Sequence, residues 1–260
     1  MLERKPLFDN VIELSFQAGV LFGCNIYLIF DSGEWMLVDI GYEESVPELV
    51  ELIRQMDFPF ARCNTVIVTH TDVDHAQGLA KVKQLLKTTV TAHSLAVPIL
   101  ETGDRVRTMA EIPAHQISLD MPPVDVDRAV HDGDTIKVGS LDIEVWHSPG
   151  HTDNHLSLRM GNLLFSGDTI YRDGCVGAID GQHGSNIVSF MDSLRRMRNS
   201  DVEWLLPAHG PPFRKNDRLI DDAIARLERY QHMADFGMCA VDWPLMDEWE
   251  REVAEGKRPT

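Results

Sequence analysis

Four side chains of the kinds that bind metal ions stand within a stretch of six residues. They are His70, Asp72, Asp74 and His75, and they follow the apolar run 66–68. If these groups were held together away from water, the two carboxylates would repel each other and raise each other's pKa. A divalent cation removes that repulsion. The spacing therefore predicts a metal site at the end of a buried strand.

Three later segments look like further ligand donors. Each places a histidine or an aspartate beside small residues, directly after an apolar stretch; the donors are His151, Asp168 and His209. Side chains that follow buried strands in this way collect at the carboxyl ends of a sheet, where ligands bind in layered α/β domains.

The elements that must position these residues alternate between strands and helices. In the first half we expect a hairpin of strands 26–30 and 35–39, a helix capped by Ser45, a strand over 64–69, a helix over 79–86 and a strand over 88–92. In the second half we expect strands at 135–138, 141–146, 155–160, 163–166 and 202–206, and helices at 187–197 and 217–234. This alternation predicts one layered α/β domain over residues 1–260.

Residues 101–130 do not fit this pattern, because Gly103, Pro113, Pro122 and Pro123 interrupt it. A long irregular segment in a compact domain is often a lid or a binding loop. A plain surface connection is the equal alternative.

Composition narrows the class of partner. The formal net charge of −17 would repel phosphate backbones, so a nucleic-acid partner is not expected, and the substrate should be a small molecule. The four cysteines are far apart, which favours a reducing compartment over a disulfide framework. The chain shows no leader peptide and no apolar stretch of the about 20 residues that a membrane span needs, so we expect a cytoplasmic protein without a membrane partner. The oligomeric state is left open.

Together with the segment 37–41, the four blocks of donor residues occur in the order found in a known family. The chain resembles the metallo-β-lactamase-fold superfamily over nearly its whole length, and within it the branch of glyoxalase II and the lactonases. The resemblance implies a four-layered αβ/βα sandwich of two mixed β-sheets, with a dinuclear metal site at its edge.

The same resemblance implies which residues bind each metal ion. One metal ion would take His70, Asp72 and His151, the other would take Asp74, His75 and His209, and Asp168 would bridge the two. Asp39, which matches the first family motif, could orient a ligand histidine or serve as a structural turn residue.

The chain departs from the family pattern at Asp72, where most members have a second histidine. A carboxylate adds negative charge and hardens the site, so zinc is the first expectation while iron and manganese stay open. A carboxylate at this position is similar to the diiron reductases of the superfamily, which carry glutamate there and normally an appended flavin domain, and we expect no such domain in this protein. Because aspartate is one methylene shorter, Asp72 could instead be only a hydrogen-bond acceptor.

Other residues near the four blocks are weaker candidates for a role in the site. His183, Tyr171 and Arg172 are candidates for substrate contact, and His155 is expected to hydrogen-bond to the backbone. The remaining histidines are expected to have no role in the site; these are His93, His115, His131, His147 and His232.

The chemistry that follows is hydrolysis. A hydroxide that bridges two metal ions is a nucleophile near neutral pH, and Asp168 or Asp74 could pass its proton to the leaving group. We therefore expect a dinuclear metal-dependent hydrolase of a small ester-like substrate, such as a lactone, a thioester or a phosphoester. The alternative is an iron-dependent oxidoreductase or dioxygenase on the same scaffold, suggested by the carboxylate of Asp72.

Overall fold

The structure is a computed structural model that describes residues 6–15 and 23–231. His232, Cys239 and the end of the helix expected over 217–234 lie outside the described residues.

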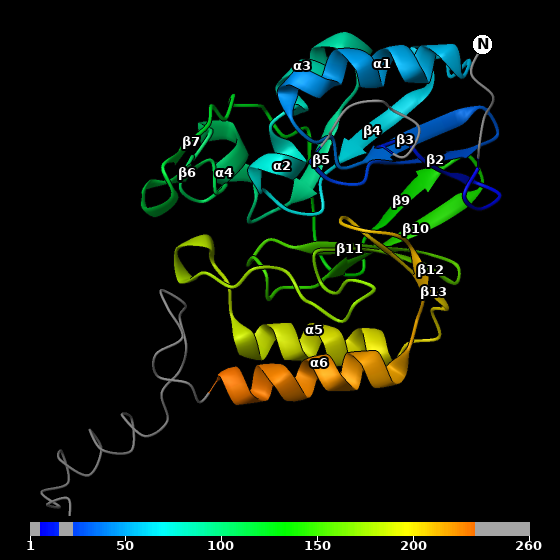
Figure 1. Ribbon diagram of the computed structural model, residues 1–260. Coiled ribbons are helices and arrows are strands. Elements are labelled where there is room, and N and C mark those ends of the chain that lie inside the picture. Colours follow the sequence, from blue (N-terminus) through cyan, green and yellow to red (C-terminus); the bar gives the residue numbers. More distant parts are fainter. Residues whose placement is uncertain (1–5, 16–22, 232–260) are drawn as a thin grey trace, which may run out of the picture.

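Two six-stranded mixed sheets form the centre of the molecule (Figure 1). The first has the order β1-β2-β3-β4-β5-β8, with strands β1 (Val11–Glu13), β2 (Tyr27–Asp31), β3 (Glu34–Val38), β4 (Cys63–Ile67), β5 (Val90–His93) and β8 (Arg128–Val130). Strands β1 to β3 are antiparallel neighbours, and β3, β4, β5 and β8 run parallel. The expected hairpin at the start of the chain is therefore confirmed as β2 and β3.

The second sheet has the order β14-β13-β12-β11-β10-β9. Its strands are β9 (Thr135–Val138), β10 (Leu141–His147), β11 (Leu156–Met160), β12 (Leu163–Gly167), β13 (Trp204–Pro207) and β14 (Phe213–Arg214). The pair β12 and β13 is parallel, while the other neighbours are antiparallel. Strands β8 and β14 were not expected from the sequence; each is only two or three residues long.

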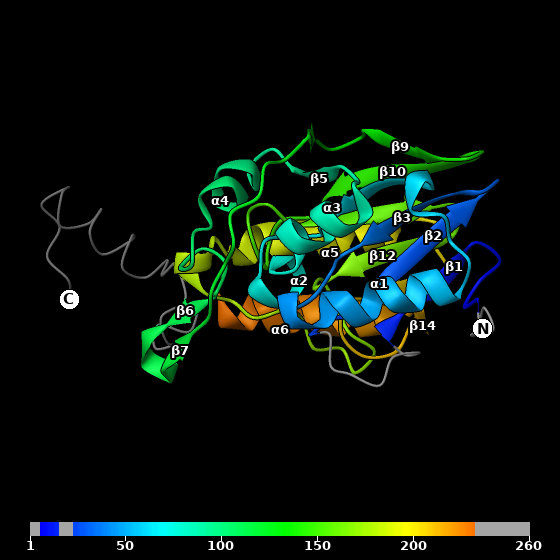
Figure 2. The ribbon, with the colours of Figure 1, turned by 90° about the horizontal axis from the view of Figure 1, so that it is seen from above.

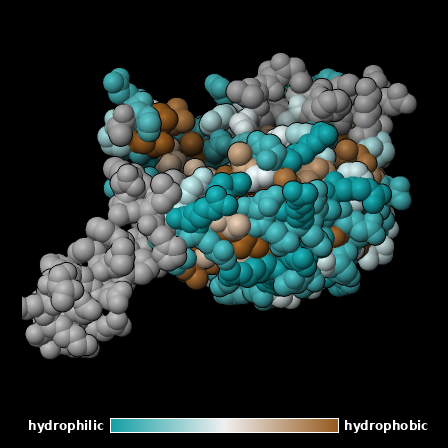
Figure 3. Space-filling view, turned by 60° about the horizontal axis from the view of Figure 1, so that its bottom comes forward, coloured by the Kyte–Doolittle hydropathy of each residue, from teal (hydrophilic) through white to brown (hydrophobic). Residues whose placement is uncertain are grey.

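Helices cover the outer face of each sheet. Helices α1 (Val46–Gln55) and α3 (Leu79–Leu86) lie on the first sheet, and α5 (Ile187–Asn199) and α6 (Asp217–Tyr230) lie on the second (Figures 1 and 2). The order helix, sheet, sheet, helix confirms the four-layered αβ/βα sandwich. The outward face of α5 and α6 is mostly hydrophilic, as expected for an outer layer (Figure 3).

Three apolar clusters fill the spaces between the layers. Successive residues of β2 alternate between them: Tyr27 and Ile29 face the second sheet, whereas Leu28 faces the helices of the first sheet. Side chains of a strand point alternately to either side. Because each side of β2 contacts an apolar cluster, the strand is buried on both faces. This explains why the strand is a continuous apolar run in the sequence.

The segment 101–130 begins at the end of α4 (Val97–Thr102) and contains a small hairpin. Strands β6 (Glu111–Ile112) and β7 (Ile117–Ser118) are joined by the 3-10 helix η4 (Pro113–His115), and this hairpin stands at the side of the molecule (Figure 1). A cavity of about 280 Å³ separates it from the turn that contains Asp180 and Gln182.

One predicted helix cap and some predicted strand bounds were inaccurate. Ser45 does not cap α1 with its side chain, because the 3-10 helix η2 (Glu43–Ser45) runs directly into α1 and gives Ser45 helical backbone angles. Strand β4 ends at Ile67, two residues earlier than expected, since the chain turns there toward the short helix α2 (Val73–Ala76). Within residues 6–15 and 23–231, no helix is both long and apolar enough to cross a membrane.

Candidate metal centre

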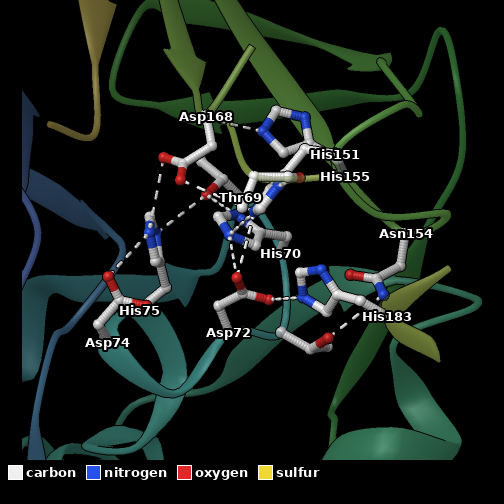
Figure 4. A network of polar contacts seen from close by, with 12 residues as sticks. Thr69, His70, Asp72, Asp74, His75, His151, Asn154, His155, Asp168 and His183 are labelled. Carbon is white, nitrogen blue, oxygen red and sulfur yellow. Dashed lines mark hydrogen bonds and ion pairs between the residues drawn. The ribbon is translucent and has the colours of Figure 1, made fainter. Parts of the chain in front are cut away.

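The loops that follow β4, β10, β12 and β13 meet at one edge of the sandwich. They bring together the residues of the 70–75 stretch with His151 and Asp168 (Figure 4), and with His209. Each loop follows the carboxyl end of its strand, where we expected a binding site. The four donors of that stretch and three donors that are distant in sequence thus converge on one place.

The first group of donor atoms comes from His70, Asp72 and His151. The Nε2 atom of His151 lies 3.2 Å from Nε2 of His70 and 3.1 Å from Oδ2 of Asp72, and the last two atoms are 3.5 Å apart. All three side chains are buried or nearly so. Asp72 is therefore long enough to present one oxygen to this group, although it is shorter than glutamate.

The second group comes from Asp74, His75 and His209. The Nε2 atoms of the two histidines are 3.4 Å apart, and Oδ2 of Asp74 lies 3.8 Å from His75 and 3.4 Å from His209. His209 is the most open of the donors, with 35% of its side chain exposed. This group therefore faces solvent more than the first does.

Asp168 lies between the two groups. Its Oδ2 is 3.7 Å from Nε2 of His151 and 3.4 Å from Nε2 of His209, and its Oδ1 is 3.6 Å from Nε2 of His75. Oδ1 is buried and has no hydrogen-bond partner among the described residues. A buried, unsatisfied carboxylate oxygen is costly unless a cation or another donor reaches it.

The spacing of the donor atoms fits metal ions better than it fits hydrogen bonds. Two ligand atoms that are each about 2.0–2.2 Å from a tetrahedral metal ion are separated by about 3.3–3.6 Å. The separations within the two groups and to Asp168 run from 3.1 to 3.8 Å. Zinc and iron ions both accept nitrogen and oxygen ligands with separations of this size.

Hydrogen bonds on the far side of the rings fix which nitrogen faces the centre. Nδ1–H of His75 donates to Oδ2 of Asp39 at 3.1 Å, and Nδ1–H of His151 donates to the carbonyl of Ala178 at 2.7 Å. The hydroxyl of Thr69 donates to Asp39 and accepts from Nδ1 of His70 at 3.0 Å. Each of these rings therefore directs its Nε2 toward the centre. This role of Thr69 was not predicted from the sequence, although Thr69 directly precedes His70.

Asp39 combines the two roles that the sequence left as alternatives, a structural turn residue and a residue that orients a histidine. It has a positive φ of 61°, so it is a turn residue, and its carboxylate orients His75. His155 accepts a hydrogen bond from the backbone N–H of Asp168 at 3.0 Å, which confirms its expected backbone contact. A Cβ on Gly167 would lie 2.5 Å from that ring, so glycine is required there.

Two acids of the centre, Asp72 and Asp168, are held in their charged form. Burial would raise the pKa of Asp72, but His183, His70 and His151 outweigh it and hold the pKa well below its usual range. The pKa of Asp168 is likewise lowered against burial, first by His75. The ionised carboxylate is the form that binds a metal ion.

The three candidates for substrate contact lie in two different places. Tyr171 and Arg172 line a cavity of about 520 Å³ beside His209. The ring of Tyr171 meets that of His209 edge to face at 5.8 Å. His183, in contrast, is fully buried and bonds to Asp72, which argues against direct contact with a substrate. Away from the centre, His93 stacks on His147 at 4.1 Å.

Comparisons with known proteins agree with this geometry. The model of the metallo-beta-lactamase superfamily matches residues 19–209. Acyl-coenzyme A thioesterase MBLAC2 from Gallus gallus is 28% identical over 230 residues, which cover 79% of this chain and 79% of that protein. Hydroxyacylglutathione hydrolase from Methylobacterium nodulans is 33% identical over 132 residues, or 50% of this chain and 43% of that enzyme, so the match spans less than half of it.

Among solved structures, TTHA1623 in a di-iron-bound form superposes with a TM-score of 0.60 and 27% identity, covering 74% of this chain and 89% of that one. The matched family model, the two mixed sheets and the named hydrolases lead to one conclusion. The chain belongs to the metallo-β-lactamase superfamily and is a metal-dependent hydrolase.

Proposed function

We propose that this chain hydrolyses the thioester bond of a small acylated thiol, with two divalent ions held by its seven donors. The position of Asp168 between two groups of donor atoms is the observation that supports this proposal most. The first ion would bind His70, Asp72 and His151, the second would bind Asp74, His75 and His209, and Asp168 would reach both. When bound, a pair of such ions polarises a carbonyl oxygen and makes water acidic near neutral pH.

The chain's own carboxylates handle the proton. Asp168 lies at the centre of the donors, and Asp74 lies at its more open side, with 26% of its side chain exposed. Either can accept the proton of the attacking water and return it to the leaving thiolate. Because a thiol has a pKa of about 8.5, the thiolate leaves readily and no separate strong acid is needed to protonate it.

The cavity beside His209 supplies the substrate contacts. Arg172 is exposed there and can pair with a carboxylate or phosphate of the thiol carrier. Burial and the neighbouring carboxylate of Asp168 raise the pKa of Tyr171, which therefore stays a neutral hydroxyl donor. These features, together with the thioesterase and the glutathione hydrolase among the relatives, favour a thioester over a lactone or phosphoester.

Zinc is the first expectation for the metal, and iron is the alternative. The carboxylate of Asp72 and the similarity to TTHA1623 in a di-iron-bound form favour iron. The same two observations support a second candidate function, an iron-dependent oxidoreductase or dioxygenase.

The test combines metal analysis of the isolated protein with a panel of acyl-thiol, lactone and phosphodiester substrates. We expect two divalent ions per chain and turnover of thioesters. His151→Ala and Asp168→Ala should each lower kcat/KM at least about 1000-fold, a loss of about 4 kcal/mol or more of transition-state stabilisation. The exposed His115→Ala is the control and should keep full activity. Full activity in either site variant would refute the assignment, and oxygen consumption without thioester turnover would favour the second function.

A further inference from the structure

His183 makes one distinctive contact. It is fully buried in the 3-10 helix η5 (Gly181–His183), and its Nε2 hydrogen-bonds to Oδ1 of Asp72 (Figure 4). A carboxylate only accepts, so Nε2–H is the donor. The other nitrogen, Nδ1, is buried with no partner among the described residues. Within the described part of the chain, the ring of His183 therefore hydrogen-bonds to Asp72 alone.

The two oxygens of Asp72 are divided between two tasks. Oδ1 is held by His183, while Oδ2 lies 3.1 Å from Nε2 of His151 and 3.5 Å from Nε2 of His70. An aspartate can rotate about two side-chain bonds, and either of its two oxygens could face the group. A hydrogen bond to one oxygen removes that freedom and fixes the direction of the other.

The turn that carries His183 also holds a second ligand of the same group. The carbonyl of Ala178 accepts from Nδ1 of His151, and the hydroxyl of Ser185 donates to the backbone carbonyl of His151 at 2.5 Å. The turn itself is fixed by Asp180, whose side chain accepts from the N–H of Gln182. Residues 178–185 therefore contact Asp72 and His151, both members of the first group. In the second group, His75 is oriented by Asp39 from another part of the chain.

We propose that His183 is a positioning residue for Asp72, and that it sets the metal affinity of the first group of donors separately from that of the second. The proposal rests on the metal centre of the proposed function. The pair of His183 and Asp72 would take the place of the imidazole that most family members carry. Loss of such an orienting partner typically lowers metal affinity by about 10–100-fold.

The experiment measures cobalt(II) binding to the metal-depleted full chain, by calorimetry and by the visible spectrum of the bound ion. Two variants remove the donor: His183→Leu keeps most of the volume, and His183→Ala truncates it, so the result can be taken from whichever folds by circular dichroism. We expect one of the two binding events to weaken about 10–100-fold and the other to change less than about threefold. The spectrum of the affected ion should shift.

Two further variants separate positioning from a structural role. His183→Gln keeps an N–H near the position of Nε2 and should restore affinity to within about threefold. In an Asp72→Ala background, removal of His183 should add less than about threefold, because the group that it positions is gone. Gln182→Ala, in the same turn but exposed, is the matched control and should leave both binding events unchanged.

Equal weakening of both events, failure of His183→Gln to rescue, or an undiminished loss in the Asp72→Ala background would each overturn this inference. These outcomes differ from failure of the proposed function. If the wild-type chain bound no metal ion or hydrolysed no thioester, the function itself would fail. If it did both, and if replacing His183 left metal binding to the first group of donors unchanged, only the positioning role would fail.

Discussion

At the scale of single residues, Asp39 shows how the protein accepts a local cost to build its centre. Its φ of 61° lies in the left-handed region, which is uncommon for any residue other than glycine, although aspartate tolerates it better than most. The conformation persists because both carboxylate oxygens are used: Oδ1 accepts the N–H of Thr69 at 2.7 Å, and Oδ2 accepts from His75. A residue that looks like an ordinary turn aspartate thus holds both ends of the 69–75 segment that follows β4.

Asp39→Asn keeps the size of the side chain but removes the charge that orients His75. We expect the metal affinity of the second group of donors to fall by about 10–100-fold, because the ring loses its charged acceptor. Cobalt titration of the metal-depleted chain checks this. Asp125→Asn, which removes the same charge at an exposed site, is the control. Similar losses in both variants would show a general effect of charge instead.

At the scale of elements, the loop between β10 and β11 depends on close packing against α5. Gly150 has a φ of 150°, and a Cβ there would lie 2.4 Å from Cα of Phe190. That contact is with the backbone of a helix, which cannot turn aside. The glycine lets α5 approach directly behind His151.

Gly150→Ala should therefore destabilise the fold strongly. Backbone strain of about 1–2 kcal/mol adds to an overpacking cost of about 1–3 kcal/mol, so we expect a loss of about 3 kcal/mol in the free energy of unfolding. Gly161→Ala is the matched control: its φ is 58° and its Cβ would meet nothing within 4 Å, so only the strain remains. Urea unfolding of both variants compares the two costs. Equal destabilisation would contradict the role of the α5 contact.

A second element contact makes stability depend on pH. Burial, with the neighbouring His147 and His131, lowers the pKa of His93 to about 4. The unfolded chain takes up this proton near the ordinary histidine value of about 6.5, so it binds more protons than the folded chain between about pH 6.5 and about pH 4. The contribution of His93 is therefore complete above about pH 6.5 and is lost as the pH falls toward about 4.

His93→Gln removes this titration. We expect its free energy of unfolding to fall less steeply than that of the wild type over the same pH window, measured by denaturant titration at each pH. The exposed His115→Gln should keep the wild-type slope. Parallel curves for wild type and His93→Gln would rule out the contribution.

At the scale of the whole molecule, the candidate centre lies at one edge of the sandwich and draws on loops of both sheets. The chain has 41 acidic against 24 basic residues, and several of its carboxylates are gathered at the candidate centre. Because the donors come from loops of both sheets, ions bound there would join the two halves of the sandwich. Metal binding should thus be coupled to global stability.

Chelation of the metal ions should lower the melting temperature. An ion at 100 times its Kd stabilises the folded state by about 2.7 kcal/mol, which corresponds to roughly 5–10 °C for a chain of this size. Differential scanning calorimetry with and without chelator measures the shift. His209→Ala should reduce the shift but not abolish it, because the donors of the first group remain. A melting temperature unaffected by chelator would contradict the coupling.

The sequence by itself predicted the layered fold and pointed to the seven candidate donors that the fold brings together, because both depend on local patterns of residues. Apolar runs specify buried strands, and the residues that follow those strands must meet at one edge of the sheets. It also showed that Asp72 is unusual. It did not reveal β8 and β14, since strands of two or three residues carry almost no periodic signal and depend on their neighbours for pairing.

Only the tertiary structure decided how the donors are held. His183 is 111 residues from Asp72, and Asp39 is 36 residues from His75, so no spacing in the sequence could pair them. His183 looked like a substrate contact because glycine-rich loops often bind ligands, whereas the fold buries it behind Asp72. Which carboxylate oxygen faces the centre, and which nitrogen carries the proton, follows from hydrogen bonds that exist only after the two sheets have packed together.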